Sequence, residues 1–441
     1  MTARVAELLP TLRRDLEALT RIPSVSLAAF DQAHVEASAQ SVAEMLRVEG
    51  LDVEIVKEGG RPAVIGHIDG PEGAPTVMLY AHHDVQPPGA DSDWDSAPFE
   101  PTERQGRLYA RGIADDKAGV MAHIAALRVH SGALPVGVTV FVEGEEEVGS
   151  DSLGTILERH GDKLRADVIV LADSTNWAVG KPALTTTLRG MIRVVLTVRA
   201  LDHGIHSGMF GGAVPDAITA LIRLIATLHD AEGNVAVAGL KSGVASDLGY
   251  PEEQLREESG LLDGVEMIGS GSILSRLWSK PSITTIGIDA PSVATSSNTL
   301  VPQAAAKISM RIAPDEDPQH GYWRLAEHLR ANAPWGVKID IELDDEGAGF
   351  SADANGPVYD QARAAFTDAW GVAPVDIGVG GSIPFVAAFA EKFPDAGILV
   401  TGVEDPDTRA HGANESLHLG EFEKVCLAEA VLLERLGLLR G

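Results

Sequence analysis

Apolar residues at helical spacing and apolar residues in short continuous runs alternate along the first part of the chain. Residues 33–50 carry Val35, Ala39, Val42 and Leu46 three or four positions apart, as in an amphipathic helix. The segments that follow read as strand, strand, strand, helix, strand, helix and strand: DVEIV, PAVIGHI, TVMLYAH, DKAGVMAHIAALRVH, VGVTVFVEG, residues 152–164 and ADVIVLAD. Strands that alternate with helices indicate an α/β layer structure with a largely parallel sheet.

The pattern changes near residue 188 and returns to its first form near residue 353. The segments between these points, which surround a polar stretch at 241–265, read as strand, helix, strand, helix and strand: LRGMIRVVLTVRA, VPDAITALIRLIATLHD, KISMRIA, DPQHGYWRLAEHLRANA and VKIDIEL. The helix VYDQARAAFTDAWG and the strand GILVTGV then resemble the first part again. We therefore expect a discontinuous first domain, 1–188 and 353–441, with an inserted α+β domain at 189–352.

Composition supports two folded domains and narrows the class of partner. A chain of 441 residues exceeds what one hydrophobic core usually supports, and an apolar content of 45% excludes a disordered chain. The formal net charge of −29 argues against nucleic acid and anionic membranes as partners. Cys426 is the only cysteine and lies in a periodic apolar stretch, so we expect a buried thiol and no intrachain disulfide.

Neither a signal segment nor a membrane span is predicted. The N-terminal stretch MTARVAELLPTLRRDLEAL has acidic residues among its leucines. No later apolar run approaches the roughly 18 residues that a membrane span needs. We therefore expect a cytoplasmic protein.

Three groups of polar residues follow predicted strands: HHD at 82–84, EEE at 145–147, and Asp173. In α/β sheets ligands gather at the carboxyl ends of strands. The acidic run has two interpretations. It can be solvated at the edge of a sheet, or a bound cation can offset its repulsion, because carboxylates bind zinc and a free carboxylate can act as a base.

Other candidate ligands have similar alternatives when each is taken alone. His82 and Asp84 face the same side of a strand, so His82 can bind a metal while Asp84 accepts a hydrogen bond from its other nitrogen. A turn with a satisfied histidine is the alternative. Asp115 and Asp116 stand where a helix begins and can simply cap it. His411 lies in the polar loop RAHGANE and is either a ligand or a solvated histidine.

Taken together and in order, these segments resemble motifs of the aminoacylase and carnosinase family of dinuclear zinc peptidases. The resemblance extends from RIPSVS to the final histidine and rests on YAHHDVQPPG with WDSAPFEP, LYARGIADDKAG, EGEEEVGS, the Asp after a strand, IHSGMFGG, GGSIP and AHGANE. Three of these, HHDVQP, IHSG and GGSIP, look most like the dipeptidase branch that includes cytosolic nonspecific dipeptidase. The resemblance implies a zinc-peptidase catalytic domain at 1–188 and 353–441 and a lid and dimerisation domain at 189–352.

The resemblance also implies two zinc ions in each subunit, which Mn²⁺ or Co²⁺ can replace. It makes His82 and Asp173 ligands of one ion and Glu147 and His411 ligands of the other, with Asp115 as the bridge between them. Two zinc ions lower the pKa of a bridging water towards about 7, which prepares it to attack an amide carbon.

Neighbouring carboxylates receive supporting roles. The resemblance makes Glu146 the general base, which takes the proton of the water and returns it to the departing amine, and makes Asp84 the residue that orients His82. We expect Glu145 to face away as a solvated neighbour.

Residues of the inserted domain are implied in substrate binding. His206 in GIHSG matches a histidine that stabilises the tetrahedral intermediate from the other subunit of a homodimer; a plain loop histidine is the alternative. Arg311 matches an arginine that holds the substrate carboxylate, with a structural salt bridge as the alternative. Asn298 and Ser382 fall where relatives contact substrate.

One departure affects the expected substrate. Dipeptidases of this branch commonly have Arg-Glu before GGSIP, where this chain has Gly378 and Val379. The Glu would help to bind a free amino group. We therefore expect a hydrolase of small carboxylate-bearing amides, with dipeptides as the first hypothesis and N-acyl or N-carbamoyl amino acids as the second. A noncatalytic ligand-binding dimer is the alternative from another class.

Overall fold

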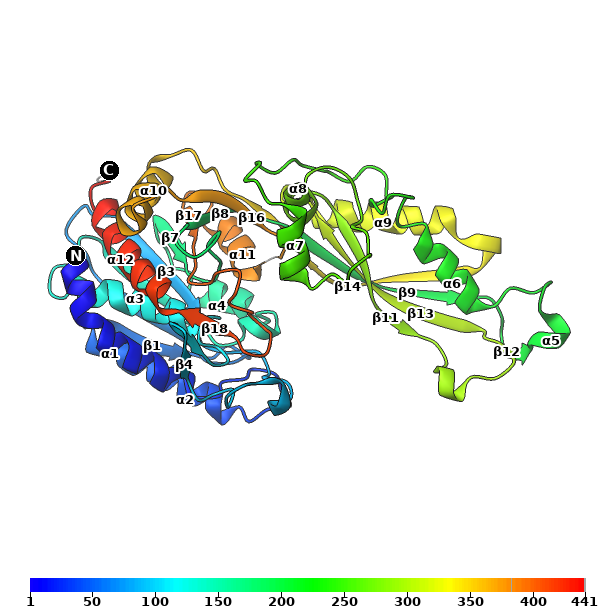
Figure 1. Ribbon diagram of the computed structural model, residues 1–441, viewed down its shortest axis with the longest axis horizontal. Coiled ribbons are helices and arrows are strands. Elements are labelled where there is room, and N and C mark those ends of the chain that lie inside the picture. Colours follow the sequence, from blue (N-terminus) through cyan, green and yellow to red (C-terminus); the bar gives the residue numbers. More distant parts are fainter. Residues whose placement is uncertain (382, 440–441) are drawn as a thin grey trace. The chain divides into compact units, whose positions relative to one another are not determined.

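The computed structural model describes residues 1–381 and 383–439, and the chain divides into two compact units (Figure 1). The first comprises Met1–Thr186, Ala352–Ile377 and the described residues from Pro384 onward; the second comprises Thr187–Ser351 and the described residues of Gly378–Ile383. The sequence analysis assigned this last segment to the first domain. It groups with the second unit because the Arg189 N–H donates to Val379 O and Arg189 Nε donates to Gly380 O at 3.1 Å.

The helices of the first unit are α1 (Thr2–Thr20), α2 (Ala33–Val48), α3 (Lys117–Val129), α4 (Leu153–His160), α10 (Pro357–Trp370), α11 (Pro384–Lys392) and α12 (Leu419–Leu436). The large sheet, most of whose strands belong to the first unit, consists of β1 (Asp52–Val56), β2 (Ala63–Ile68), β3 (Thr76–His82), β6 (Gly137–Glu143), β7 (Val168–Leu171), β8 (Ala183–Leu188), β15 (Phe350–Ser351), β16 (Val375–Val379) and β17 (Gly397–Val400). Their order among the described residues is β1-β2-β6-β3-β7-β17-β8-β15, with β16 paired to β8.

This sheet is mixed. Strands β6, β3, β7 and β17 are parallel neighbours at its centre, while β1, β2 and β8 pair antiparallel around them. The predicted α/β fold with a mixed sheet is therefore confirmed, and its parallel part is confined to the four central strands.

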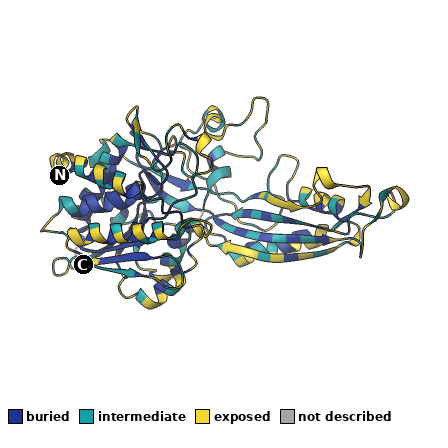
Figure 2. Cartoon of the chain, turned by 90° about the horizontal axis from the view of Figure 1, so that it is seen from below, coloured by how far each residue is buried: buried dark blue, intermediate teal, exposed yellow. Residues whose placement is uncertain are grey.

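The central strands are almost entirely buried (Figure 2). Apolar residues pack on both of their faces, which explains their continuous apolar runs. Leu79 and its neighbours pack in a core with α1, α2, α3, α10 and α12. On alternate positions, Tyr80 and Phe141 meet α11, where the rings of Tyr80 and Phe385 stack with centroids 3.5 Å apart. Cys426 of α12 is buried, as the sequence predicted.

A short sheet, β18-β5-β4, lies beside the large one in the first unit. It consists of β4 (Thr102–Arg104), β5 (Arg107–Tyr109) and β18 (Ser416–His418). The Ala110 N–H donates to Glu415 O at 3.1 Å, just beyond the β5–β18 ladder. The short sheet therefore brings the turn that carries Asp115 next to the segment after His411.

The second unit is built on an antiparallel sheet of order β11-β13-β9-β14, with β9 (Gly190–Arg199), β11 (Ser282–Asp289), β13 (Gln303–Ile312) and β14 (Lys338–Gly347). Alternate residues of β9 and β13 are buried in one core with residues of α6 (Ala217–Ala226) and α9 (Pro318–Asn332). Its remaining elements are β10 (Ile205–His206), α5 (Ser207–Phe210), α7 (Glu252–Ser259), α8 (Ile273–Trp278), β12 (Thr299–Leu300) and short 3-10 turns.

The polar stretch 241–265 contains α7 and forms part of the wall of a cavity of about 690 Å³ inside the second unit. The charged groups beside that cavity are already bound by backbone carbonyls: Arg276 Nη1 donates to Ile268 O at 2.8 Å, and Lys280 Nζ donates to Ser270 O at 2.7 Å.

In the described part of the chain, none of the helices combines the length and the apolar character that crossing a membrane requires.

Candidate metal centre

The polar groups that follow β3, β6 and β7 meet at one edge of the large sheet. Strand β3 lies between β6 and β7 and runs parallel to both, so the carboxyl ends of the three strands lie side by side. His82 is the last residue of β3, Glu146 and Glu147 begin the 3-10 turn after β6, and Asp173 follows β7. The parallel register therefore collects ligands from segments far apart in the sequence.

The imidazole of His82 is fully buried among carboxylates. Its Nε2 lies 3.1 Å from Asp115 Oδ1 and 3.9 Å from Asp173 Oδ2. Its Nδ1 lies 3.1 Å from the carbonyl oxygen of Asp84 and 3.5 Å from Asp84 Oδ1. Burial opposes the charged form, but the bonds to Asp115 and Asp84 prevail and raise the pKa of His82 well above its ordinary value.

Asp115 joins the two histidines. Its Oδ1 contacts His82, and its Oδ2 lies 3.0 Å from Nε2 of His411, which is also 3.3 Å from Glu147 Oε2. Burial would raise the pKa of Asp115, but its bonds to both imidazoles lower it. One carboxylate with an imidazole on each oxygen has the form of a bridge between two cations.

Among the described residues, two clusters of three side chains could each hold a metal ion, because the donor atoms within each cluster lie within 4.8 Å of one another. The clusters are His82 with Asp115 and Glu147, and His82 with Glu146 and Asp173. His411 adds a second imidazole beside the first cluster. This grouping places Glu146 among donor atoms, although the sequence analysis assigned it the role of base.

The charge balance of these clusters suits a cation. Burial raises the pKa of Glu146 to about 8, and the carboxylates of Glu147, Asp84 and Asp115 add to that rise. Burial and nearby carboxylates also raise the pKa of Asp173 well above its ordinary value. A bound dication would offset this repulsion, and a mixed imidazole and carboxylate donor set suits Zn²⁺ and related divalent metals. The residues present therefore fit a divalent metal centre.

Asp84 connects the histidine with the acidic turn. Its Oδ1 accepts the Glu146 N–H at 3.2 Å and its Oδ2 accepts the Glu147 N–H at 3.1 Å. The same side chain lies against Nδ1 of His82. Asp84 therefore contacts a histidine from one strand and holds the backbone of two glutamates in the next loop.

The expectation of a solvated Glu145 is wrong. Glu145 is only 4% exposed, and its carboxylate accepts the Arg61 N–H at 2.8 Å and the Ser152 N–H at 2.6 Å. It points away from the donor clusters into its own loop, where two backbone donors replace water. The three consecutive glutamates thus have different surroundings.

Asp116 occupies the N-cap position of α3, but its side chain makes no capping hydrogen bond. Its Oδ2 instead accepts the backbone N–H of His82 at 3.2 Å. Both aspartates of the DD pair therefore serve the centre, and the cap interpretation fails for their side chains.

Sequence reasoning did not single out Glu415, whose carboxylate binds the backbone of the turn that carries Asp115. Its carboxylate accepts Arg111 Nη1 at 2.6 Å and the backbone N–H groups of Gly112, Ala114 and Asp115 at 2.9, 3.1 and 3.2 Å. The only sequence signal was its place in AHGANE, four positions after His411.

The residues implied in substrate binding belong to the second unit or are undescribed. His206 on β10 is exposed, its Nδ1 accepts the Gly208 N–H at 3.0 Å, and the next N–H, of Ser207, donates to Asn298 O at 2.9 Å. The β10–β12 ladder therefore brings His206 and Asn298 together. Arg311 lies on β13, opposite Met191 of the neighbouring strand β9 and Ser282 of the neighbouring strand β11. Ser382 falls outside the described residues.

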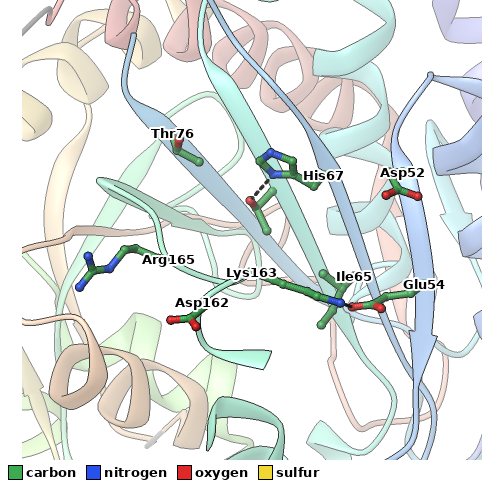
Figure 3. Close-up of a pocket in the computed structure, with 9 residues that line it drawn as sticks. Asp52, Glu54, Ile65, His67, Thr76, Asp162, Lys163 and Arg165 are labelled. Carbon is green, nitrogen blue, oxygen red and sulfur yellow. Dashed lines mark hydrogen bonds and ion pairs between the residues drawn. The ribbon is translucent and has the colours of Figure 1, made fainter. Parts of the chain in front are cut away.

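A separate charged pocket of about 350 Å³ lies elsewhere on the first unit (Figure 3). Thr76, at the start of β3, lines it and lies about 20 Å from His82 at the rise of a β-strand. Lys163 Nζ donates to Glu54 Oε1 at 2.6 Å, and His67 hydrogen-bonds Thr139 (Figure 3). Because Lys163 pairs with Glu54 and none of the candidate metal ligands lines this pocket, we do not assign it to the chemistry.

The chain is similar to known proteins along most of its length. A model of peptidase family M20/M25/M40 matches residues 78–435. The chain is 36% identical over 406 residues to a cysteinylglycine-S-conjugate dipeptidase of Corynebacterium striatum, covering 90% of this chain and 89% of that protein. It is 28% identical over 401 residues to the beta-Ala-His dipeptidase of Homo sapiens, covering 85% of this chain and 77% of that protein.

Solved structures agree in fold. The dipeptidase Dug1p of Saccharomyces cerevisiae has a TM-score of 0.82 at 24% identity, covering 99% of this chain and 98% of that chain. Human carnosine dipeptidase 1 has a TM-score of 0.82 at 23% identity, with the same coverage. The motifs, the donor clusters and the matched length lead to one conclusion: the chain belongs to peptidase family M20/M25/M40, as the resemblance implied.

Proposed function

We propose that the protein is a dinuclear zinc dipeptidase. The observation that carries the proposal is the Asp115 carboxylate with His82 on one oxygen and His411 on the other, because this arrangement suits a bridge between two cations. The curated relatives named above are dipeptidases that match most of the chain. We also propose a cytoplasmic location, as expected from the sequence.

The metal ligands that we propose are His82 and Asp173 for one ion, Glu147 and His411 for the other, and Asp115 for both. When bound, two zinc ions supply Lewis-acid polarisation of an amide carbonyl and make a nearby water molecule more acidic. Mn²⁺ or Co²⁺ can replace zinc, since the donor set does not select strongly among these metals.

Glu146 is the general base of this proposal. Its backbone N–H is held by Asp84, so the position of its carboxylate is set by the same side chain that orients His82. The Glu146 carboxylate takes a proton from the attacking water and delivers it to the amine that leaves. The pKa of about 8 without metal falls when cations bind, so the carboxylate is ionised and can accept the proton.

Substrate binding completes the proposal. His206 donates to the oxygen of the tetrahedral intermediate in the partner subunit, which makes the active form a homodimer. Arg311 holds the substrate carboxylate, and Asn298 and Ser382 contact the substrate. The neighbouring positions of His206 and Asn298 support a shared role.

The rival assignment is an N-acyl or N-carbamoyl amino acid hydrolase with the same centre. Val379 favours it, because an apolar residue stands where relatives of this branch commonly have a glutamate for the substrate amine. The two assignments differ only in what occupies the amine side.

A panel of unblocked dipeptides and their N-acetylated and N-carbamoylated counterparts tests the proposal. Amine release by zinc-loaded protein is measured with and without a chelator. We expect chelator-sensitive cleavage of the unblocked dipeptides. Cleavage of the blocked compounds alone would transfer the enzyme to the rival assignment, and the absence of any metal-dependent cleavage would favour a noncatalytic ligand-binding dimer.

A further inference from the structure

Glu404 lies in the loop after β17, directly beside the loop that carries Asp173. The Glu404 N–H donates to Ser174 O at 3.4 Å, and the Glu404 carbonyl accepts the Asn176 N–H at 2.9 Å. Gly402 permits this close approach, because a Cβ there would stand 1.5 Å from Ser174 O. Glu404 is therefore fixed at the same sheet edge as the candidate ligands.

The side chain of Glu404 lies within the electrostatic field of the centre. Burial raises its pKa well above the ordinary value, and the carboxylates of Asp115 and Glu415 raise it further, while the His411 imidazole lowers it. Glu404 belongs to neither of the clusters whose donor atoms lie within 4.8 Å of one another. It is near the centre without being one of the ligands that we propose.

Glu404 also lacks the hydrogen-bond partners that six other carboxyl groups in this region have. Those groups each accept a hydrogen bond from a backbone or side-chain donor: Asp84, Asp116, Glu143, Glu145, Asp405 and Glu415. Among the described residues, the half-buried side chain of Glu404 makes no hydrogen bond or ion pair. A half-buried carboxylate that no donor of the described chain reaches is open to a partner on the substrate.

The chemistry of an unblocked dipeptide supplies such a partner. Its α-ammonium nitrogen is bonded to the Cα next to the scissile carbonyl carbon, so the two atoms are about 2.5 Å apart. An acceptor for the ammonium must therefore lie immediately around the reacting centre. Val379 offers no carboxylate for this purpose.

We propose that Glu404 accepts the α-ammonium group of the substrate and thereby selects unblocked dipeptides over acylated amino acids. This inference rests on the proposed dipeptidase function and deepens it. It assigns to the loop after β17 the contact that the Gly378-Val379 segment has lost. Glu404 is then a specificity-determining residue that touches the substrate but holds no metal.

Two ligands that differ only in the amine test the proposal: alanylglycine and propionylglycine. For zinc-loaded wild type, Glu404→Gln and Glu404→Asp, we measure kcat and KM for alanylglycine and the inhibition constant of propionylglycine. The matched control is Glu391→Gln, an exposed glutamate on α11 of the same unit.

We expect Glu404→Gln to lower kcat/KM for alanylglycine about 10- to 100-fold, the usual size of a lost charge-assisted hydrogen bond. The same substitution should change the inhibition constant of propionylglycine less than about twofold, because this ligand has no ammonium group that could contact Glu404. Glu404→Asp should retain part of the selectivity, and Glu391→Gln should match wild type.

The outcomes separate this inference from the function on which it rests. Unchanged kcat/KM for alanylglycine in Glu404→Gln would overturn the inference while leaving the dipeptidase proposal intact. Equal losses for both ligands, together with a lower zinc content or melting temperature, would show that Glu404 supports the metal or the fold instead. A wild type that cleaves propionylglycine but not alanylglycine would refute the dipeptidase proposal itself.

Discussion

Glu415 holds the backbone of Asp115 in place, since its carboxylate accepts the Asp115 N–H at 3.2 Å across 300 positions of sequence. The same carboxylate binds the buried guanidinium of Arg111 at 2.6 Å. The turn that presents the bridging carboxylate is thus anchored by a residue that binds no metal in our proposal.

Replacement of Glu415 by Gln should weaken both the fold and the metal site. The amide has one acceptor oxygen, so it leaves Arg111 and a backbone donor unpaired in the interior. We expect the free energy of unfolding of the metal-free protein to fall by about 3 kcal/mol and zinc affinity to fall about 10-fold. Urea unfolding and chelator competition measure the two effects. A decrease of less than about 1 kcal/mol in the free energy of unfolding would contradict the anchoring role of Glu415.

His82→Ala and Glu147→Ala should each reduce the zinc bound to fewer than two ions per subunit and lower activity at least about 100-fold. The reason is that each removes a donor from a cluster that shares its remaining ligands. Metal content after gel filtration is the measurement. His67→Ala, a histidine of β2 beside the separate charged pocket, should keep full metal content and activity.

Glu146→Gln should abolish most turnover while both metals stay bound. A lost general base typically costs about 10²- to 10⁴-fold in kcat. The adjacent Glu145→Gln is the matched control: it disturbs two backbone hydrogen bonds, so it should lower stability by about 1–3 kcal/mol and leave kcat within a few-fold of wild type. A Glu146→Gln protein with normal kcat would rule out the proposed base.

The stability of the protein should depend on pH through Glu143. Burial raises the pKa of this carboxyl to about 7, and its Oε2 accepts the Tyr80 hydroxyl at 2.9 Å. Because the folded pKa exceeds the unfolded value, the folded state holds the extra proton. The contribution of Glu143 to stability is complete below pH ~4.5 and is lost as pH rises to ~7, at about 1.4 kcal/mol per pH unit.

Glu143→Gln tests this linkage, since the amide keeps an acceptor for Tyr80 but has no proton to lose. Urea unfolding of metal-free wild type and variant between pH 4.5 and 8 is the measurement. As pH rises, the free energy of unfolding of the variant should increase relative to that of the wild type. A difference that stays constant with pH would contradict the assignment.

Complementation between inactive variants tests the proposed homodimer. If His206 serves the site of the partner subunit, then His206→Ala and Glu146→Gln are each inactive alone. Mixed dimers contain one intact site, so refolding or exchanging the two variants together should restore about a quarter of wild-type activity. A mixture that remains inactive, although mixed dimers are detected, would show that His206 does not act across the interface.

The fold class and the candidate groups at the strand ends could be predicted from the sequence. Apolar runs identified the central strands, and polar residues at their ends identified His82, Asp173 and the acidic run, because apolar patterning and side-chain alternation are local properties. The discontinuous organisation was also visible in the change of pattern near residue 188. These groups meet at one sheet edge, although the role of each remains a prediction.

Only the tertiary structure decided which carboxylates have partners. Glu145 is buried against Arg61 and Ser152, Glu415 anchors Asp115, and the segment from Gly378 groups with the second unit through Arg189. Glu404 differs from Glu145 and Glu415 because no donor of the described chain reaches it. The physical reason is that hydrogen bonds between distant loops depend on how the sheet brings them together, and no local pattern of residues encodes that distance.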